Sequence, residues 1–403
     1  MNFKKSIKTS DLTISNIVEN QSLSFISSLN QKAADLIKEG KDIIKLSGGD
    51  PSHVPERLLS ILSDLCASSE KSIFNYSPIA GFDKLRELIS LIPASYYHNP
   101  VTKDNILVSS GGCSGLFLTF KTILNPGDKV LIQDPCWEYL PRLIENCAGI
   151  PVYMKFFSSP FLKPNWEDLI SEIQNQLKMG VKVVSINSPL NPSGRIIPID
   201  VKNSIIKLCY DYQAWFVSDD VTIDFNYVED NPKSIKNLEN FISVNSFSKN
   251  LGITGLRFGF VVACENIINQ LKKSQLYTFM YPNSFIQKLI ESYLASSKEE
   301  YNEFINNIRA RYKTYATDYT QMLSAIPEIE VQRPEGGLFL FPKFKSNQPI
   351  NFDKLLTKYC LAVAPGAAFG SDCESHFRLF MGVSPEQMIR TTHLLSKFVQ
   401  ELQ

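Results

Sequence analysis

The amino-acid sequence predicts an α/β fold built on a mostly parallel sheet of seven strands. Short runs rich in β-branched and aromatic residues recur along the chain, and patterns typical of helices lie between them. Strands that alternate with helices form parallel sheets whose two faces are both covered. The expected strands are 106–109, 129–133, 152–156, 181–187, 214–218, 241–245 and 257–263.

Two of the intervening helices have clear boundaries in the sequence. The first, 112–124, has apolar residues at helical spacing and ends at an Asn-Pro-Gly-Asp turn. The second begins at Asn165, whose side chain can cap it, and ends at Gly180. Each helix is followed at once by a predicted strand, as a βαβ arrangement requires.

The length and composition of the chain predict two domains. With 403 residues, of which 44% are hydrophobic, the chain exceeds what one hydrophobic core usually organises. After residue 283 the pattern changes to long polar helices and then to a small α+β region. We expect an N-terminal arm and part of the small domain at 1–48, a large domain at 49–290 and a small C-terminal domain at 291–403.

Charge and cysteine usage narrow the class of partner and the compartment. The 41 basic residues balance 41 acidic ones, so no net field attracts nucleic acid or an anionic membrane, and a small-molecule partner is expected. The eight cysteines are scattered without a Cys-x-x-Cys pair, which favours reduced thiols and no metal site. We find no signal-peptide pattern and no run long enough to span a bilayer, and we predict a cytoplasmic protein.

The strongest chemical signal is the segment from Ser246 to Gly259, which follows the predicted strand 241–245. Lys249 lies there in a polar loop of small residues, with Ser246 three residues before it and Arg257 eight residues after it. An isolated loop lysine is usually a solvated surface group. A desolvated amine beside other cations instead has a lowered pKa and can attack an aldehyde.

Three further motifs follow predicted strands. Asp219 and Asp220 come after strand 214–218, Asn191 lies in an Asn-Pro turn after strand 181–187, and Trp137 follows strand 129–133. Taken singly, these are ordinary turn, cap or core residues. Because the carboxyl ends of parallel strands meet at one edge of a sheet, we expect them to converge there.

A fourth motif is a glycine-rich turn between strand 106–109 and the helix that follows. It contains Gly111, Gly112 and Cys113. Glycines there can simply allow a tight turn. The N-terminus of a helix approached closely by backbone N–H groups is also a phosphate-binding site.

In this order and spacing, the motifs closely resemble the class I and II aminotransferases, the fold-type I enzymes related to aspartate aminotransferase. The resemblance covers nearly the whole chain. It implies a large domain that binds pyridoxal 5′-phosphate (PLP), with Lys249 holding the cofactor as a Schiff base and later carrying the α-proton of the substrate. It also implies that Asp219 faces the pyridine nitrogen, that Asn191 donates to the ring oxygen and that Trp137 stacks on the ring. The phosphate ligands implied are Gly111, Gly112, Cys113, Ser246 and Arg257.

The resemblance also assigns residues to substrate and assembly. Arg378, in a Phe-Arg-Leu-Phe segment, matches the arginine that clamps the substrate α-carboxylate through two parallel hydrogen bonds. Gly49 matches the glycine whose backbone approaches the same carboxylate. Tyr76 matches the tyrosine that reaches the phosphate in the neighbouring subunit, which implies a homodimer with shared active sites.

Two residues depart from the family pattern or lack a counterpart in it. Thr222 occupies the position beside the cofactor where the family has a tyrosine, and its shorter hydroxyl either loses the contact with the ring oxygen or makes it through water. His53 follows Gly49 closely and either reaches the substrate entrance or is an exposed loop residue without a role. Thr222 is a neutral substitution or a sign of chemistry beyond transamination.

The function predicted from these residues is transfer of an amino group from an L-amino acid to a 2-oxo acid. The alternative is a PLP-dependent lyase, cyclase or oxidase on the same scaffold, because the same residues begin all of these reactions. A non-catalytic protein of this fold is disfavoured by the presence of Lys249, Asp219, Asn191 and Arg378. The substrate side chain stays open, since we identify no second arginine for a dicarboxylate.

Overall fold

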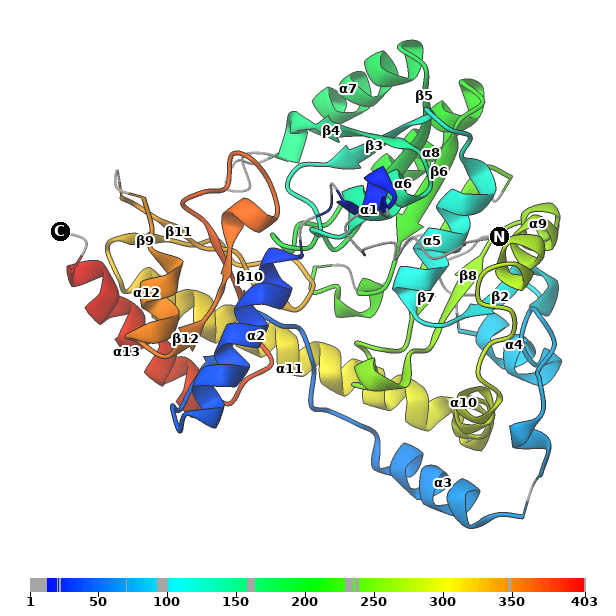
Figure 1. Ribbon diagram of the computed structural model, residues 1–403, viewed down its shortest axis with the longest axis horizontal. Helices are drawn as coiled ribbons and strands as arrows, with labels where there is room; N and C mark the ends of the chain where they lie inside the picture. Colours follow the sequence, from blue (N-terminus) through cyan, green and yellow to red (C-terminus); the bar gives the residue numbers. More distant parts are fainter. Residues whose placement is uncertain are drawn as a thin grey trace, which may run out of the picture.

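Seven strands form one sheet at the centre of the larger part of the molecule (Figure 1). The computed structural model describes residues 13–19, 21, 23–69, 71–92, 101–157, 164–228, 235, 239–346 and 349–401. The strand order is β2-β8-β7-β6-β5-β3-β4, and only β8 runs antiparallel to its neighbours. The predicted mostly parallel sheet of seven strands is confirmed. Its strands are β2 (Ile106–Ser109), β3 (Lys129–Gln133), β4 (Ile150–Met154), β5 (Val181–Asn187), β6 (Trp215–Asp219), β7 (Phe241–Ser246) and β8 (Gly259–Val262).

Helices cover both faces of this sheet because successive residues of a strand point to opposite sides. In β6, Phe216 belongs to the hydrophobic core that the sheet shares with α3, α4, α7, α8 and α10, whereas Val217 belongs to the core on the other face, which includes α5, α6 and α9. The covering helices are α3 (Glu56–Ala67), α4 (Asp83–Ser90), α5 (Gly112–Ile123), α6 (Leu140–Asn146), α7 (Trp166–Lys178), α8 (Ile199–Asp211), α9 (Glu265–Leu276) and α10 (Ser284–Ser296).

The strand β4 lies two residues earlier than predicted. The sequence predicts 152–156, but residues Lys155–Phe157 form a 3-10 turn. The backbone N–H groups of Lys155 and Phe156 donate to the carboxylate of Glu172 at 2.9 and 3.2 Å, and not to a neighbouring strand. The predicted Asn165 cap of α7 is confirmed, since its side chain accepts from the N–H of Glu167.

A second hydrophobic core lies in the C-terminal part of the chain. It joins Ile44 and Leu46 to apolar residues from Ile308 to Val399. The long helix α11 (Lys298–Ser324) contributes Tyr301 to the core beside the large sheet and Tyr312 to this second core. The predicted small α+β region is therefore present, although its boundaries at 48 and 290 stay predictions. Its helices are α2 (Phe25–Lys38), α12 (Phe352–Thr357) and α13 (Pro385–Gln400), and α1 (Asn16–Glu19) precedes them.

Short strands complete this second part. They are β1 (Ile44–Lys45), β9 (Ile329–Glu330), β10 (Phe339–Leu340), β11 (Lys343–Phe344), β12 (Leu361–Ala362), β13 (Ala364–Pro365) and β14 (Phe377–Phe380). The pairing of β1 with β12 brings the segment just before Gly49 to the C-terminal region. The pairing of β14 with β10 and β13 fixes Arg378 in a three-stranded sheet.

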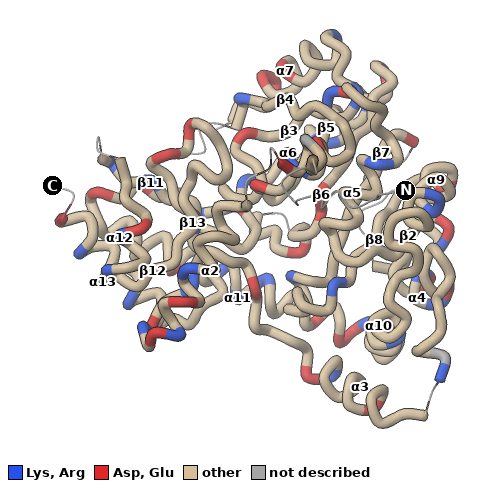
Figure 2. The backbone as a smooth tube through the Cα atoms, in the orientation of Figure 1, with Lys and Arg blue, Asp and Glu red and all other residues tan. Residues whose placement is uncertain are grey.

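Basic and acidic residues lie interspersed over helices and loops along the backbone (Figure 2). Within the described ranges, no helix combines the length and the apolar character that crossing a membrane requires.

Candidate active site

The four adjacent parallel strands at the centre of the sheet each end in a polar residue. These are Gln133, Asn187, Asp219 and Ser246, the last residues of β3, β5, β6 and β7. The register pairs Asn187 directly with Asp219. Crevices at the carboxyl ends of such strands are the usual ligand sites of open α/β sheets.

A pocket lies at this edge, between the large sheet and the C-terminal part. It holds about 1300 Å³ of empty space, part of which is open to solvent. Most of the residues that the sequence singles out meet here, although they come from distant segments. The lining includes Gly49, Gly112, Cys113, Trp137, Asn191, Asp219, Thr222, Ser246, Lys249, Arg257 and Arg378.

The amine of Lys249 lies in this pocket and donates a hydrogen bond to the carbonyl oxygen of Gly49 at 2.5 Å. Burial lowers the pKa of Lys249 from 10.5 to about 8. The carboxylate of Asp50 opposes this shift, and the guanidinium groups of Arg378 and Arg257 lower the pKa further. A larger fraction of the amine is therefore unprotonated at neutral pH than for a surface lysine.

The two acidic residues at the end of β6 have opposite surroundings. Asp219 lines the pocket, and burial raises its pKa to about 7, while a hydrogen bond from the N–H of Val221 opposes the shift. Asp220 points away from the pocket and forms an ion pair with Lys202 at 3.0 Å, with both side chains buried. Of these two adjacent acidic residues, Asp219 is therefore the one available to a ligand in the pocket.

The guanidinium of Arg378 enters the pocket from β14 and is almost completely buried. It donates to the side-chain oxygen of Asn191 at 2.8 Å and to the carbonyl oxygen of Ser47 at 2.6 Å. Its carbon Cζ lies 3.9 Å from the ring centroid of Phe339. Among the described residues its Nε has no hydrogen-bond partner, which leaves one buried donor for a ligand.

Asn187 connects this arginine to the acidic residue. Its side-chain oxygen accepts from the N–H of Asn191 at 2.7 Å, and its side-chain nitrogen donates to the carbonyl oxygen of Asp219 at 2.9 Å. Asn191, which receives the hydrogen bond from Arg378, is thus held in place through its backbone. Through these hydrogen bonds the turn at Asn191 and the strand end at Asp219 form one unit.

The N-terminus of α5 lies beside the guanidinium of Arg257. Gly111 has φ +93°, and a Cβ there would lie 2.7 Å from Nη2 of Arg257. Arg257 itself has φ 55° and donates to the carbonyl oxygen of Thr254 at 2.8 Å. A left-handed conformation is uncommon for a residue with a side chain and occurs at functional sites. Ser246 lies nearby and donates to the carbonyl oxygen of Phe258 at 2.7 Å. Helix N-terminus and guanidinium together attract negative charge.

Trp137 and Thr222 line other parts of the pocket. The ring of Trp137 lies 5.0 Å from that of Tyr139. The hydroxyl of Thr222 donates to the carbonyl oxygen of Pro189 over 3.4 Å, which is long for such a bond. Position 222 therefore faces the pocket, as the sequence predicts.

His53 does not lie among the residues that line the pocket, in contrast to the predicted contact with substrate. Its Nε2 lies 3.0 Å from the carbonyl oxygen of Lys249, and its ring packs 5.8 Å from Tyr312 and 6.1 Å from Phe304. The prediction of an exposed loop histidine is also wrong, because this aromatic packing partly buries the ring. Loop 50–53 turns the side chain toward α11 and away from the cavity.

Tyr76 also lies outside the pocket of its own chain. Its side chain is 82% exposed, and its ring lies 4.8 Å from that of Tyr281. Tyr76 is therefore not among the residues that surround Lys249 of the same chain. A residue that contributes to a neighbouring subunit would have to be exposed in this way.

Some pocket residues carried no usable signal in the sequence. Ile26 on α2, Phe339 on β10 and Ser47 reach the pocket only through tertiary packing. Asn187 is the last residue of the predicted strand 181–187, but its role as a bridge depends on strand register. Asp50 follows Gly49 directly, and its proximity to Lys249 emerges only in three dimensions.

Comparison with known proteins agrees with this geometry. Relatives include the aspartate aminotransferase of Pyrococcus horikoshii, 26% identical over 89% of this chain and 91% of that protein. A probable aspartate/prephenate aminotransferase of Aquifex aeolicus is 27% identical over 93% of this chain and 95% of that one. The crystal structure of the aspartate aminotransferase of Thermotoga maritima superposes with a TM-score of 0.85 at 25% identity, covering 96% of this chain and 100% of that chain.

These relatives are named for amino-group transfer. They favour transamination over the lyase, cyclase and oxidase alternatives and over a non-catalytic role. The family model described as aminotransferase class I and II matches residues 41–394, and this family implies PLP as the cofactor. The chain is therefore an enzyme that belongs to the class I and II aminotransferases.

Proposed function

We propose that Lys249 holds PLP in the pocket and that the enzyme transfers the amino group of an L-amino acid to a 2-oxo acid. The observation that carries this proposal is the environment of Lys249. Its amine is buried in a ligand-sized pocket, has a pKa of about 8, and shares that pocket with Asp219 and Arg378. A nucleophilic lysine needs this combination of burial and neighbouring cations.

The residues present fit the cofactor. The N-terminus of α5 at Gly111, Gly112 and Cys113, together with Arg257 and Ser246, would hold the phosphate. Asp219, which lines the pocket, would face the ring nitrogen, and its carboxylate would favour the protonated ring. The remaining contacts proposed for the ring are Asn191 and Thr222 at its oxygen and Trp137 on its face.

The bound cofactor supplies an electron sink that makes the Cα proton of the substrate removable. Arg378 binds the α-carboxylate through its guanidinium and uses the buried Nε that has no hydrogen-bond partner in the described part of the chain. The backbone at Gly49 lies beside the same carboxylate. With these contacts the Cα–H bond is directed at Lys249, whose amine removes the proton and returns it during transfer.

The pKa of Lys249 suits this role. A general base works best when its pKa lies close to the pH of the reaction. Asp50 keeps the pKa of Lys249 from falling further, while Arg378 and Arg257 keep it from rising. Burial, adjusted by these three charged groups, therefore holds the amine in the range where it both accepts and donates a proton.

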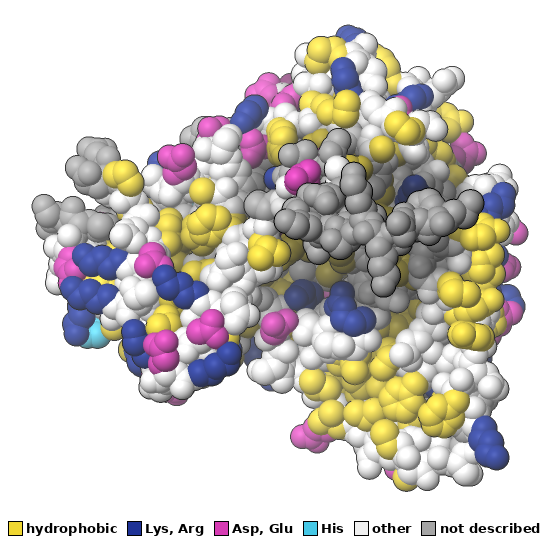
Figure 3. Space-filling model, in the orientation of Figure 1, with side chains coloured by type: hydrophobic (Ala, Val, Ile, Leu, Met, Phe, Trp, Pro, Cys, Tyr) yellow, Lys and Arg dark blue, Asp and Glu magenta, His cyan; other side chains and the backbone are white. Residues whose placement is uncertain are grey.

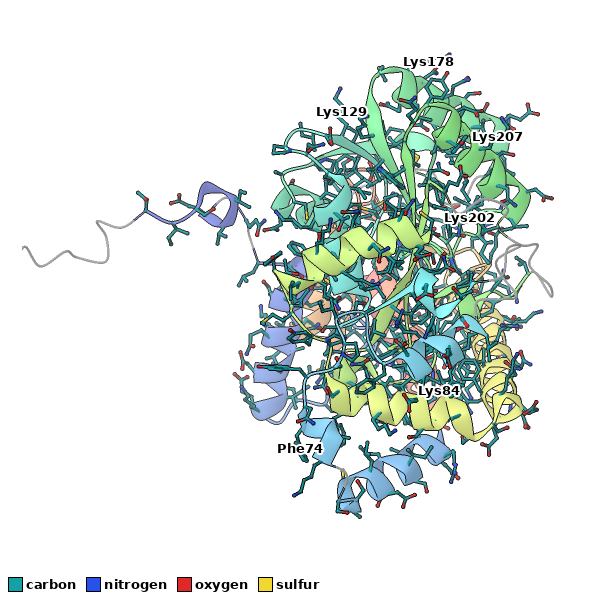
Figure 4. All side chains as sticks on the ribbon, turned by 90° about the vertical axis from the view of Figure 1, so that its right-hand side faces the viewer. Phe74, Lys84, Lys129, Lys178, Lys202 and Lys207 are labelled. Atoms are coloured by element: carbon teal, nitrogen blue, oxygen red, sulfur yellow. The ribbon has the colours of Figure 1, made fainter. Side chains whose placement is uncertain are left out.

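We also propose a homodimer in which Tyr76 reaches the phosphate of the partner site. Large apolar side chains are exposed in the same two sequence segments as Tyr76 and its ring partner Tyr281: Phe74 and Tyr277 are each 85% exposed. Figure 4 shows Phe74 at the edge of the molecule. Apolar side chains also form patches on the face shown in Figure 3. Exposed apolar surface of this kind is typical of subunit contacts.

The compartment proposed is the cytoplasm. All eight cysteines are free, and four of them are buried. Burial raises the pKa of Cys136 to about 12 and that of Cys373 to about 12, so these thiols stay protonated and unreactive. Reduced, inert thiols fit a reducing compartment.

The test of the reaction is a panel of single amino acids added to the PLP-loaded enzyme without a 2-oxo acid. Transamination predicts stoichiometric conversion of the cofactor to pyridoxamine 5′-phosphate and release of one 2-oxo acid per site. Adding a second 2-oxo acid should then restore the original absorbance. Ammonia, peroxide or a cyclised product in place of this half-reaction would contradict the proposal.

A further inference from the structure

Lys249 is held at both ends by one short segment, 49–53. The side-chain amine donates to the carbonyl oxygen of Gly49 at 2.5 Å. The backbone carbonyl oxygen of the same lysine lies 3.0 Å from Nε2 of His53. These two contacts bridge 200 and 196 residues of sequence, so they result from tertiary structure alone.

The two loops also touch through their backbones. Gly252, three residues after Lys249, has φ +65°, and a Cβ there would overlap the carbonyl oxygen of His53. The same Cβ would lie 3.3 Å from the carbonyl oxygen of Pro51. No side chain fits between them, so the backbones of loop 249–252 and loop 51–53 lie in close contact at Gly252. The histidine therefore contacts the lysine loop with both its ring and its backbone.

The ring of His53 acts here as a neutral donor. Burial lowers its pKa below the ordinary value, the charge of Arg311 lowers it further, and the backbone carbonyls of Lys249 and Asn250 oppose the shift. A carbonyl oxygen can only accept, so Nε2 must carry the hydrogen that points at Lys249. Aromatic rings of α11 and of the segment after β6 pack around the imidazole and fix its plane: Phe225, Phe304 and Tyr312.

We propose that His53 is a positioning residue for Lys249: its Nε2–H fixes the lysine carbonyl, so that segment 49–53 sets where the lysine amine lies. This inference rests on the proposed function, because it concerns the lysine that is proposed to hold the cofactor. Gly49 belongs to the same segment and is proposed to adjoin the substrate carboxylate. Segment 49–53 therefore contacts Lys249, which carries the proton, and through Gly49 also adjoins the proposed site of the substrate carboxylate.

Loss of the His53 hydrogen bond should let the lysine loop move and expose the amine. Burial is the largest cause of the lowered pKa of Lys249, and Asp50, Arg378 and Arg257 are the charged groups that face it. When the amine spends more time in water, its pKa returns toward the ordinary value for lysine. The apoenzyme therefore reports the effect without any turnover.

The experiment compares His53→Phe with His53→Gln. Phenylalanine keeps a ring of similar size and removes the donor, whereas glutamine keeps a side-chain N–H at about the same reach. The pH dependence of Lys249 modification by an amine reagent is measured in the apoenzymes by peptide mapping. Phe304→Leu is the matched control, because it changes the packing of the His53 ring and retains its N–H.

We expect the pH midpoint of Lys249 modification to rise by about one unit in His53→Phe and to stay near the parent value in His53→Gln and Phe304→Leu. In the loaded enzymes, kcat should fall about tenfold in His53→Phe with little change in KM. If His53 had only a structural role, His53→Gln and His53→Phe would lower the melting temperature of the protein and the reactivity of Lys249 to the same extent. That pattern, or a parent-like midpoint in His53→Phe, would overturn the inference.

A second measurement does not depend on the folding of any variant. The chain has four histidines, so ¹⁵N labelling of histidine resolves individual rings in the parent protein. We expect His53 to be the neutral tautomer with hydrogen on Nε2 at neutral pH. A Nδ1–H tautomer or a charged ring would contradict the inference. If borohydride reduction of the PLP-loaded enzyme fixes the pyridoxyl group to another lysine, the proposed function fails, and the two failures are distinct.

Discussion

Lys202 on α8 and Asp220 at the end of β6 form an ion pair of 3.0 Å between side chains that are only 6% and 3% exposed. Figure 4 labels Lys202. Ser218 donates to the same carboxylate oxygen at 2.6 Å, and Ser243 donates to the other oxygen at 2.5 Å. Lys202 and the two serines together bind both carboxylate oxygens of Asp220, so of the two adjacent acidic residues only Asp219 serves the pocket.

Breaking this pair should destabilise the fold. Lys202→Met leaves a buried carboxylate without its cation, and we expect the free energy of unfolding to fall by about 3–5 kcal/mol. The double variant Lys202→Met/Asp220→Asn removes both charges and should recover part of that loss. Denaturant titration of the two variants measures the difference. Equal stability of parent and single variant would show that the pair contributes nothing.

Asp219 should be essential for turnover and dispensable for folding. We expect Asp219→Ala to retain PLP and to lose kcat by about three orders of magnitude or more, since an unprotonated ring is a poor electron sink. Asp220→Asn is the matched control, because it alters the neighbouring carboxylate that faces Lys202. A larger loss of kcat in the control than in Asp219→Ala would reverse the assignment of the two residues.

Arg378 should act mainly on substrate capture. Arg378→Ala removes the guanidinium that would clamp the carboxylate, and we expect KM for the amino acid to rise about a hundredfold. Arg378→Lys retains the charge and cannot form two parallel hydrogen bonds, so it should restore only part of the affinity. Steady-state kinetics in both variants provides the measurement. An unchanged KM in Arg378→Ala would place the carboxylate site elsewhere.

Thr222→Tyr tests whether the threonine is a neutral substitution. Position 222 faces the pocket, and a phenol reaches further than a threonine hydroxyl. With transamination as the native reaction, we expect the variant to gain a donor to the ring oxygen and to keep transamination intact or improved. The absorbance of the bound cofactor should titrate at lower pH. Loss of the native reaction would mean that the threonine makes room for a different substrate or intermediate.

The sequence predicted the parts of this site that strand ends determine. Asp219 ends a buried strand, Lys249 and Asn191 each follow one, and parallel strands bring such positions to one edge without further information. Local sequence does not contain the packing of Phe339 beneath Arg378 or the entry of Ile26 from α2. Those contacts depend on how the C-terminal part and the N-terminal helix lie against the sheet.

The placement of His53 and the end of β4 were missed for a related reason. A loop histidine is exposed by default, and only the distant helix α11 supplies the aromatic rings that pack around this one. Likewise, β4 ends early because Glu172 on α7 takes the N–H groups that would extend it. In both cases a partner far along the chain overrides the local pattern.

The lowered pKa of Lys249 predicts how the apoenzyme captures PLP. Only the unprotonated amine attacks an aldehyde, so the capture rate should rise with pH through about 8 and level off above it. At pH 7 a pKa of about 8 leaves about one amine in ten unprotonated, against about three in ten thousand at the ordinary value. Stopped-flow absorbance from pH 6 to 10 measures this profile. A rate that still rises steeply at pH 10 would show an ordinary lysine.

The most direct test of the central claim is reduction of the PLP-loaded enzyme with borohydride, followed by peptide mapping. Reduction fixes the cofactor to the amine that holds it. The result expected is one pyridoxyl group per chain on Lys249, and no such adduct in Lys249→Ala, which should fold normally because the amine is a chemical and not a packing group. A stoichiometric adduct on any other lysine, or none on Lys249, would contradict the assignment of the active site.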